Sequence, residues 1–207
     1  MMDYAGRVAQ ADTYPKMLRL NAKEHGNEIA LRAVLGQQVS VAAARRLAGR
    51  LTALHGRPLP PGSDVIGLDG LTHVFPDAAT IAGLDPETLP MPRSRGRALV
   101  GLAHALASGT VGLDPGADRE EAAARLVALP GIGPWTAGYI GMRALSDPDA
   151  FPPGDAGVLR ALRLLGQAGE PGADAAAAQA WRPWRSYAVH HLWATLESGT
   201  KAEEIAS

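Results

Sequence analysis

The chain has 207 residues, of which 46% are hydrophobic, a formal net charge of −1 and no cysteine. This length and apolar content suffice for a soluble globular protein of one domain or two small ones. The lack of cysteine excludes disulfides, thiolate zinc sites and iron–sulfur clusters, and the near-zero charge leaves any contact with nucleic acid to local patches and backbone dipoles.

No apolar run approaches the length of a membrane span, and the start, MMDYAGRVAQ, lacks a basic region followed by a hydrophobic core. A cytoplasmic protein that makes no membrane contact is therefore expected. Valine and isoleucine do not cluster in alternating runs, whereas 24 glycines and 16 prolines supply many short turns. These patterns predict an all-α fold.

The first third of the chain is predicted to contain a lead-in, two helices and a connection. Residues 1–26 are mixed and polar, and we interpret them as a short lead-in. Residues 27–55 place apolar side chains at helical spacing, but the periodicity breaks between Gly36 and Ser40. Two helices meeting there explain the break, with Ser40 as the cap of the second. The proline- and glycine-rich stretch 56–76 is predicted to be a surface connection.

Two further helices are predicted before residue 110. Asp77 can cap a short helix through Ile81, and residues 91–107 form a longer helix with an apolar face. Three arginines crowd the start of the longer helix: Arg93, Arg95 and Arg97. We interpret them as a solvated helix face, with a phosphate-contacting patch as the alternative.

Residues from about 120 to 145 predict a helix, a tight turn and a second helix. Pro130 ends the first helix, Gly131 and Gly133 permit a close or left-handed backbone, and Pro134 suits the first turn of the second helix. The unpaired N–H groups at that helix start can hold a phosphate oxygen without any lysine. A Gly-Pro connection of this kind is also common in purely structural helix pairs.

The helix after the turn has an aromatic face. Trp135, Tyr139 and Met142 lie at positions i, i+4 and i+7 and therefore share one side. Such a stripe is often ordinary core, but the chain has only four tryptophans, four tyrosines and two phenylalanines. Together with Trp193 from the last helix, these rings can instead form a stacking pocket for an extruded, electron-poor base.

The acidic residues between the hairpin and the next helix differ in their surroundings. Asp155 follows Pro-Pro-Gly at a favoured N-cap position, and capping would keep its carboxylate ionised and oriented for chemistry. A structural and a catalytic role are therefore compatible for this residue. Asp147 and Asp149 lie in the sequence SDPDA and are interpreted as turn formers.

The end of the chain is predicted to contain a low-complexity loop with a helix over residues 166–181, and a last helix over 184–196. His190 and His191 are neighbours on that helix, point in different directions and have no evident third ligand, so we expect a structural or DNA-proximal role and no metal site. Two arginines lie at the start of the helix, Arg182 and Arg185. They either contact a nucleic-acid backbone or cover the surface.

Four segments resemble, in the family's order, the helix-hairpin-helix (HhH-GPD) DNA glycosylase superfamily, and its bacterial 3-methyladenine DNA glycosylase II (AlkA-like) branch most closely. They are LRAVLGQQVSVAAARRLAGRL, LPGIGPWTAGYIGMRAL, FPPGDAGVLRAL and WRPWRSYAVHHLWATL, which cover most of residues 27–196. The resemblance implies a compact helical core at 27–207, with two helical subdomains flanking a DNA-binding cleft and a catalytic segment at 151–165. The long form of this family has an extra N-terminal domain, so a compact version or a fragment is expected.

The resemblance also assigns roles to single residues. Asp155 corresponds to the catalytic acid, and Gln38 to the wedge side chain that enters the DNA stack, where the best-known bacterial form has leucine. A glutamine would fill the vacated space partly by hydrogen bonding. The positions of the base pocket are Trp135, Tyr139 and Trp193. The hairpin residues expected to bind DNA are Gly131, Gly133 and Thr136.

The expected reaction follows from the residue just beyond the hairpin glycines. Bifunctional members of the superfamily have a lysine nucleophile there, whereas this chain has Trp135. Lyase chemistry is therefore disfavoured, and water is the expected nucleophile. Asp155 near C1′ of the sugar would offset oxocarbenium charge and orient or deprotonate that water.

These expectations describe a monofunctional DNA glycosylase that hydrolyses the N-glycosidic bond of a flipped alkylated purine in double-stranded DNA. A monomer in the bacterial cytoplasm, associated with the nucleoid, is expected. No cofactor is expected to be required, and no iron–sulfur cluster, although turn carbonyls of the hairpin can hold a monovalent cation. The alternatives are a non-catalytic helix-hairpin-helix module that binds distorted DNA, and a structural helical domain without salt-sensitive DNA affinity.

Overall fold

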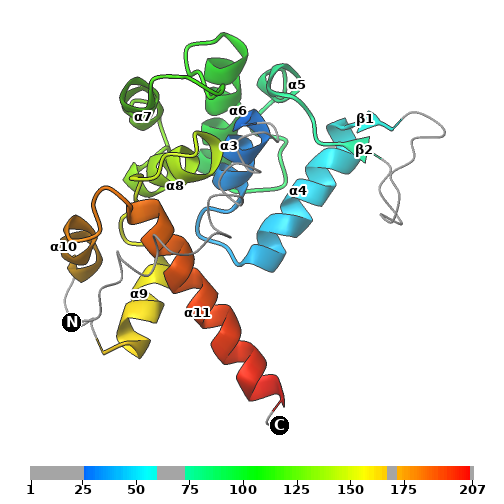
Figure 1. Ribbon diagram of the computed structural model, residues 1–207. Coiled ribbons are helices and arrows are strands. Elements are labelled where there is room, and N and C mark those ends of the chain that lie inside the picture. Colours follow the sequence, from blue (N-terminus) through cyan, green and yellow to red (C-terminus); the bar gives the residue numbers. More distant parts are fainter. Residues whose placement is uncertain (1–25, 60–72, 167–171, 206–207) are drawn as a thin grey trace. The chain divides into compact units, whose positions relative to one another are not determined.

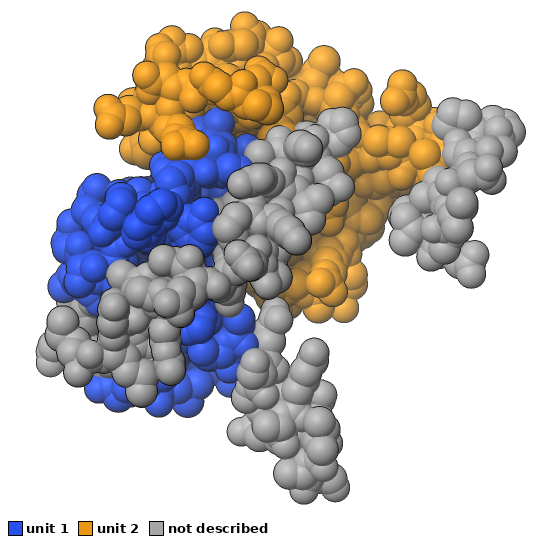
Figure 2. Space-filling view, viewed as in Figure 1, with its two compact units in different colours: residues 1–24, 133–207 blue, residues 25–132 orange. Residues whose placement is uncertain are grey.

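The computed structural model describes three stretches of the chain, residues 26–59, 73–166 and 172–205. The chain divides into two compact units: unit 2 comprises residues 25–132, and unit 1 contains residues 133–207 (Figure 2). Most described residues of both units are helical (Figure 1). The predicted helical fold class is thus confirmed. The predicted lead-in, residues 1–26, lies outside the described residues except for its last position.

Unit 2 is built around a long helix with an apolar face. Its described elements are α3 (Gly26–Leu35), α4 (Val41–His55), β1 (Arg57–Pro58), β2 (His73–Val74), α5 (Ala78–Ala82), α6 (Arg93–Ala107) and α7 (Arg119–Val127). Helix α6 packs against α5 and α3. The predicted apolar face of α6 is buried, since Leu99, Leu102 and Ala103 are 0% exposed.

Side-chain caps mark where α4 and α5 begin. Ser40 Oγ accepts a hydrogen bond from the Ala43 N–H at 3.2 Å, and Asp77 Oδ1 accepts one from the Thr80 N–H at 2.8 Å. Each bond satisfies one of the backbone donors that a helix start leaves unpaired. Both predicted caps are therefore confirmed, and the break before Ser40 separates α3 from α4.

A short antiparallel strand pair is the one addition to the predicted all-helical pattern in the described residues. Arg57 is paired with Val74, and Pro58 with His73, at the two ends of the stretch predicted to be a connection. Two residues per strand are too few for an alternating pattern to be recognised in a sequence. The strand pair therefore depends on tertiary contacts that bring the ends of this connection together.

Unit 1 contains α8 (Pro134–Ala144), α9 (Ala156–Leu164), α10 (Ala173–Gln179) and α11 (Arg185–Ile205). Helix α11 packs along α9, as Figure 1 shows. The core residues between the helices are Met142, Val158, Ala161, Leu162, Val189 and Leu192. Met142 is fully buried in this core, whereas Trp135 and Tyr139 on the same helix are only half-buried. The predicted stripe thus combines a core residue with two accessible rings.

Helix α11 is longer than the sequence pattern predicts. It begins at Arg185 and runs for 21 residues to Ile205, whereas the apolar spacing ends at Leu196. Helical backbone hydrogen bonds continue through polar residues once a helix is formed, because propagation is easier than nucleation. None of the described helices combines the length and apolar character needed to cross a membrane.

Candidate active site

The hairpin turn at the end of unit 2 is tightly packed around Gly131. This residue has a φ of +84°, and a Cβ on it would lie 2.6 Å from the Cβ of Ala98. Backbone conformation and space therefore both favour glycine. The side-chain amide of Gln37 donates a hydrogen bond to the Gly131 carbonyl oxygen at 3.0 Å. The turn is thus held by the segment that directly precedes Gln38.

The second half of the hairpin begins unit 1. Gly133 is the N-cap of α8 and provides no capping side chain, and Pro134 occupies the first turn. A helix start without a capping side chain has backbone amides available for an anion. Thr136, in the first turn of α8, is 3% exposed, so its predicted contact with DNA stays a prediction.

Asp155 lies at the centre of a buried hydrogen-bond cluster in unit 1. It is 7% exposed. Its Oδ1 accepts hydrogen bonds from the Val158 backbone N–H and the Trp193 indole N–H, both at 2.9 Å, and its Oδ2 accepts one from the Trp135 indole N–H at 2.9 Å. All three partners are donors, which suits an ionised carboxylate because that group only accepts hydrogen bonds.

Three helices contribute to this cluster. Asp155 is the N-cap of α9, Trp135 lies in the first turn of α8, and Trp193 lies on α11. The cap bond to Val158 confirms the predicted structural role of Asp155. It uses one acceptor position of the carboxylate, so the two indoles bind the same group without displacing the cap.

The three rings predicted to form the base pocket lie next to one another. Trp135 and Tyr139 stack with centroids 5.4 Å apart and planes inclined by 20°, and the Tyr139 and Trp193 centroids are 6.2 Å apart. A base between two rings needs two carbon–carbon contact distances of about 3.5–4.0 Å each. The spacing of Trp135 and Tyr139 is too small for this. A base therefore does not fit between those two rings in this arrangement.

Two glycines permit the close packing of this cluster, and neither was predicted to have a role. A Cβ on Gly157 would lie 2.9 Å from Cδ1 and Nε1 of Trp193. A Cβ on Gly138 would lie 2.1 Å from the carbonyl oxygen of Phe151, which precedes Asp155. Their position inside a helical pattern is the sequence feature that could have pointed to them, because a glycine there often marks close packing.

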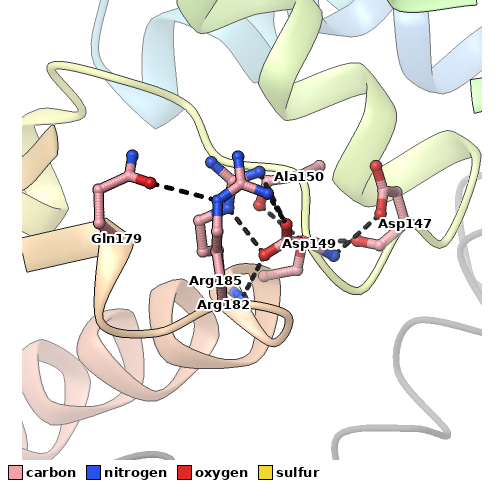
Figure 3. A network of polar contacts seen from close by, with 7 residues as sticks. Asp147, Asp149, Ala150, Gln179, Arg182 and Arg185 are labelled. Carbon is pink, nitrogen blue, oxygen red and sulfur yellow. Dashed lines mark hydrogen bonds and ion pairs between the residues drawn. The ribbon is translucent and has the colours of Figure 1, made fainter. Parts of the chain in front are cut away.

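An ion-pair network joins the loop before Asp155 to the start of α11 (Figure 3). The Asp149 carboxylate accepts hydrogen bonds from Nε and Nη2 of Arg185 at 2.8 and 3.0 Å, and from Nη1 of Arg182 at 2.8 Å. This two-point contact with Arg185 is geometrically well defined. Both arginines therefore bind a carboxylate within unit 1, and Arg185 is not simply part of the solvated surface.

The uncharged side chain of Ser186 also links α11 to this loop, beside the ion pairs. It is 0% exposed, and its Oγ lies 2.6 Å from the Asp147 carbonyl oxygen and 2.8 Å from that of Ala150. The Asp147 side chain accepts the Asp149 backbone N–H at 2.9 Å, as predicted for a turn former. The Asp149 side chain, predicted to have the same role, instead binds the two arginines. The loop that leads to Asp155 is thus fixed to α11, the helix that contains Trp193.

His190 is buried next to the aromatic cluster. It is 4% exposed, and its ring lies edge-on to Trp193 with centroids 5.5 Å apart. Burial, together with the nearby charge of Arg143, lowers its pKa to about 4. His190 is therefore neutral and structural at physiological pH, in agreement with one of its two predicted roles.

This shift predicts a loss of stability in acid. Between pH 6.5 and about 4 the unfolded chain protonates His190 whereas the folded chain does not. The free energy of unfolding should therefore fall by up to about 3 kcal/mol as the pH drops through this window, with no contribution above it. Urea unfolding at pH 7 and pH 4.5 should show a smaller loss for His190→Gln than for wild type. The exposed His104→Gln variant should behave like wild type, and an equal loss in all three proteins would contradict the assignment.

Gln38, the predicted wedge, lies in the turn between α3 and α4 of unit 2. Its side chain is exposed, and its φ of +54° is uncommon for a residue other than glycine. Such backbone conformations are frequently found at functional sites.

Helix α4, which follows Gln38, has no acidic residue and three exposed arginines: Arg45, Arg46 and Arg50. At α6, by contrast, Arg93 and Arg97 form ion pairs with Glu87 at 3.0 and 2.8 Å. The segment after Gln38 is thus locally positive despite the net charge of −1.

Comparisons with known proteins identify relatives. The family model "HhH-GPD superfamily base excision DNA repair protein" matches residues 31–186. The probable bifunctional transcriptional activator/DNA repair enzyme AlkA of Mycobacterium tuberculosis is 48% identical over 170 residues, covering 82% of this chain and 33% of the relative. DNA-3-methyladenine glycosylase 2 of Escherichia coli is 38% identical over 181 residues, covering 86% of this chain and 60% of the relative. The chain thus spans between a third and three fifths of these relatives' lengths.

A solved structure shares the fold across nearly the whole chain. The 3-methyladenine DNA glycosylase Mag1 of Schizosaccharomyces pombe, in complex with abasic DNA, has a TM-score of 0.64 and 22% identity. The match covers 92% of this chain and 94% of that protein. At this identity the likeness concerns the arrangement of the helices and not the chemistry of the site.

Proposed function

Because the chain belongs to the HhH-GPD superfamily of base excision DNA repair proteins, we propose that it is a DNA glycosylase acting on alkylated purines, with Asp155 as its catalytic carboxylate. One observation supports this more than any other. A single carboxylate, 7% exposed, is held by a helix N-terminus and by the indoles of two half-buried tryptophans. Such a group can stabilise positive charge beside a surface on which a base can stack.

The reaction follows from this arrangement. An alkylated purine with positive charge leaves with the electron pair of the bond to C1′, and positive charge develops on the sugar. Ionised Asp155 stabilises that oxocarbenium charge at close range. Water then forms the new bond to C1′, and its proton passes to Asp155 or to solvent. The leaving base needs little acid catalysis, because its own charge already weakens the bond.

Selectivity for cationic bases is proposed to come from the same rings. Their electron-rich faces attract a positively charged purine more strongly than a neutral one. Because no base fits between Trp135 and Tyr139 at a centroid distance of 5.4 Å, the flipped base would stack on an outer face of the cluster. Asp155, bonded to both tryptophans, would then be close to the sugar of that nucleotide.

Hydrolysis without strand cleavage is the proposed outcome. Lyase chemistry needs an amine that forms a Schiff base with the sugar. The sequence has lysine only at positions 16, 23 and 201, and Trp135 follows the hairpin where bifunctional relatives have that lysine. We therefore propose that water, and not a side chain of the site, attacks the sugar.

The proposed partner is double-stranded DNA bound by a monomer. The uncapped start of α8 would hold a phosphate group through backbone amides. Gln38 would enter the stack that the flipped base leaves, and the arginines of α4 would add phosphate contacts. Backbone amides and one local group of arginines can together bind DNA despite the near-neutral net charge.

We also propose that the hairpin carbonyls can hold a monovalent cation and that the reaction requires no cofactor.

A base-release assay tests the proposed function. Duplex DNA containing 3-methyladenine or 7-methylguanine should lose the free base on incubation with the protein. The strand should stay intact until alkali is added, and borohydride should trap no protein–DNA adduct, because no amine attacks the sugar. A strand nick together with a trapped adduct would contradict the hydrolytic mechanism while leaving base excision in place.

The same samples separate the two alternative functions. Salt-sensitive binding to distorted DNA without release of any base would favour a non-catalytic helix-hairpin-helix module. Absence of salt-sensitive DNA binding would favour a structural domain, since phosphate contacts weaken as salt rises. Base release above the spontaneous rate excludes both.

A further inference from the structure

A second buried carboxylate lies next to the Asp155 cluster, and the reaction described above does not use it. Asp174 is 3% exposed and lies in the first turn of α10, the short helix that packs against α9. Its Oδ2 accepts a hydrogen bond from the Gly154 backbone N–H at 2.6 Å. Burying a carboxylate is costly unless it is hydrogen-bonded, so this short bond is a substantial part of what Asp174 gains in the folded chain.

The bonded amide directly precedes Asp155. Gly154 has a φ of +74°, a left-handed conformation that residues with a side chain rarely adopt. The backbone at Gly154 therefore needs an external contact that selects one of the several conformations open to glycine. Asp174 provides that contact from a helix 20 residues further along the chain.

The Asp155 side chain does not itself fix this backbone. Its oxygens accept hydrogen bonds from Val158, Trp135 and Trp193, which orient the carboxylate once the main chain is in place. Gly154, one residue earlier, is oriented by Asp174. The two carboxylates thus have different tasks, since one faces the indoles and the other holds the peptide that presents it.

We propose that Asp174 is a positioning residue for the catalytic carboxylate: it binds the Gly154 amide and so sets the position of Asp155 relative to Trp135 and Trp193. This inference rests on the proposed glycosylase function. It assigns Asp174 an effect on the chemical step and none on DNA binding, because its hydrogen bond stays within unit 1 and the residue is buried.

The test is single-turnover release of 3-methyladenine from duplex DNA by the full chain, with DNA affinity measured separately on an abasic-site analogue. Asp174→Ala should lower the rate of release by about 10- to 100-fold, because displacements near 1 Å at a reacting group have effects of this size. The dissociation constant should stay within about twofold of wild type. Asp174→Asn keeps an acceptor oxygen and should restore most of the rate.

A matched control separates positioning from general stability. Asp77→Ala removes the N-cap bond of α5 in unit 2 and should lower the melting temperature without changing the rate of release. If Asp174→Ala is too unstable to purify, the proposal is judged on Asp174→Asn and Asp174→Ser, with the rate expected to fall further for serine because its shorter side chain does not reach Gly154.

The outcomes are distinguishable. Wild-type rates in a folded Asp174→Ala protein would overturn the positioning role and leave the glycosylase function standing. Equal rate losses in Asp174→Asn and Asp174→Ala would also overturn it, because an acceptor at this position would then not matter. Failure of the wild-type protein to release any base would overturn the proposed function, and this inference with it.

Discussion

Replacing Asp155 with asparagine is expected to lower the rate of base release by about 100- to 1,000-fold, the range found when a preorganised electrostatic contact to a transition state is removed. Asparagine is neutral, so it cannot offset the charge that develops at C1′. It also has one acceptor oxygen where aspartate has two, so one of the two indole N–H groups, from Trp135 or Trp193, loses its partner. Single-turnover release of 3-methyladenine measures the effect.

The asparagine variant should remain folded and should still bind DNA. Its amide oxygen can keep the cap bond to Val158, so the expected loss of stability is that of one indole N–H left without its partner, about 1–3 kcal/mol. Affinity for DNA with an abasic-site analogue should match wild type, because the proposed phosphate contacts are at the hairpin and not at this carboxylate. Undiminished release of base by a folded Asp155→Asn protein would rule out Asp155 as the catalytic carboxylate.

Replacing Gly138 with alanine is expected to cause the largest loss of stability among single-methyl changes around the site. The new Cβ would lie 2.1 Å from the Phe151 carbonyl oxygen and 2.7 Å from its carbon, so α8 and the loop before Asp155 must move apart. Because both contacts are to backbone, no side-chain rotation relieves them. We expect the free energy of unfolding to fall by about 3 kcal/mol, measured by urea titration.

Gly101→Ala is the matched control for this change. Gly101 is also a glycine within a helix, α6, but apart from neighbouring backbone of that helix no atom lies within 4 Å of a Cβ built on it. Alanine there should raise the free energy of unfolding by about 0.5–1 kcal/mol, because it has better helix propensity than glycine. Similar effects at the two positions would show that the close approach of α8 to Phe151 is not present in solution.

The Gly138→Ala variant should also release base more slowly than its stability alone explains. Trp135 lies on α8, and Asp155 lies just beyond the loop that α8 must displace. A shift near 1 Å between them would weaken the indole bond to the carboxylate and is expected to lower the rate by about 100-fold. Measuring release well below the melting temperature separates this effect from unfolding.

Local features of the site could be predicted from sequence because their causes lie within a few residues. The caps at Ser40, Asp77 and Asp155 each need only a side-chain oxygen and an amide three residues later. The hairpin likewise follows from the order of glycine and proline around residues 130–134. Helical spacing indicated the apolar face of α6, and a resemblance of motifs indicated which aspartate is the candidate catalytic residue.

Contacts between distant residues were decided by tertiary structure alone. Helical periodicity places Trp135 and Trp193 on apolar faces, but only the packing of α8, α9 and α11 brings both indoles to one carboxylate. Asp174 lies in an alanine-rich stretch whose composition suggests no role, and its bond to Gly154 spans 20 residues. The boundary between the two units, at Ile132 and Gly133, has no compositional signal either.

The sequence by itself thus determined the helical class, the hairpin and the capped helix starts, because these depend on local backbone chemistry, whereas the candidate carboxylate was indicated by the resemblance of its motif to those of a known family. Tertiary structure decided what holds that carboxylate, how closely the aromatic rings approach, and which glycines make room for them. The physical reason is that hydrogen bonds and steric contacts act over a few ångströms in space, whereas the residues that form them lie 13 to 38 positions apart along the chain.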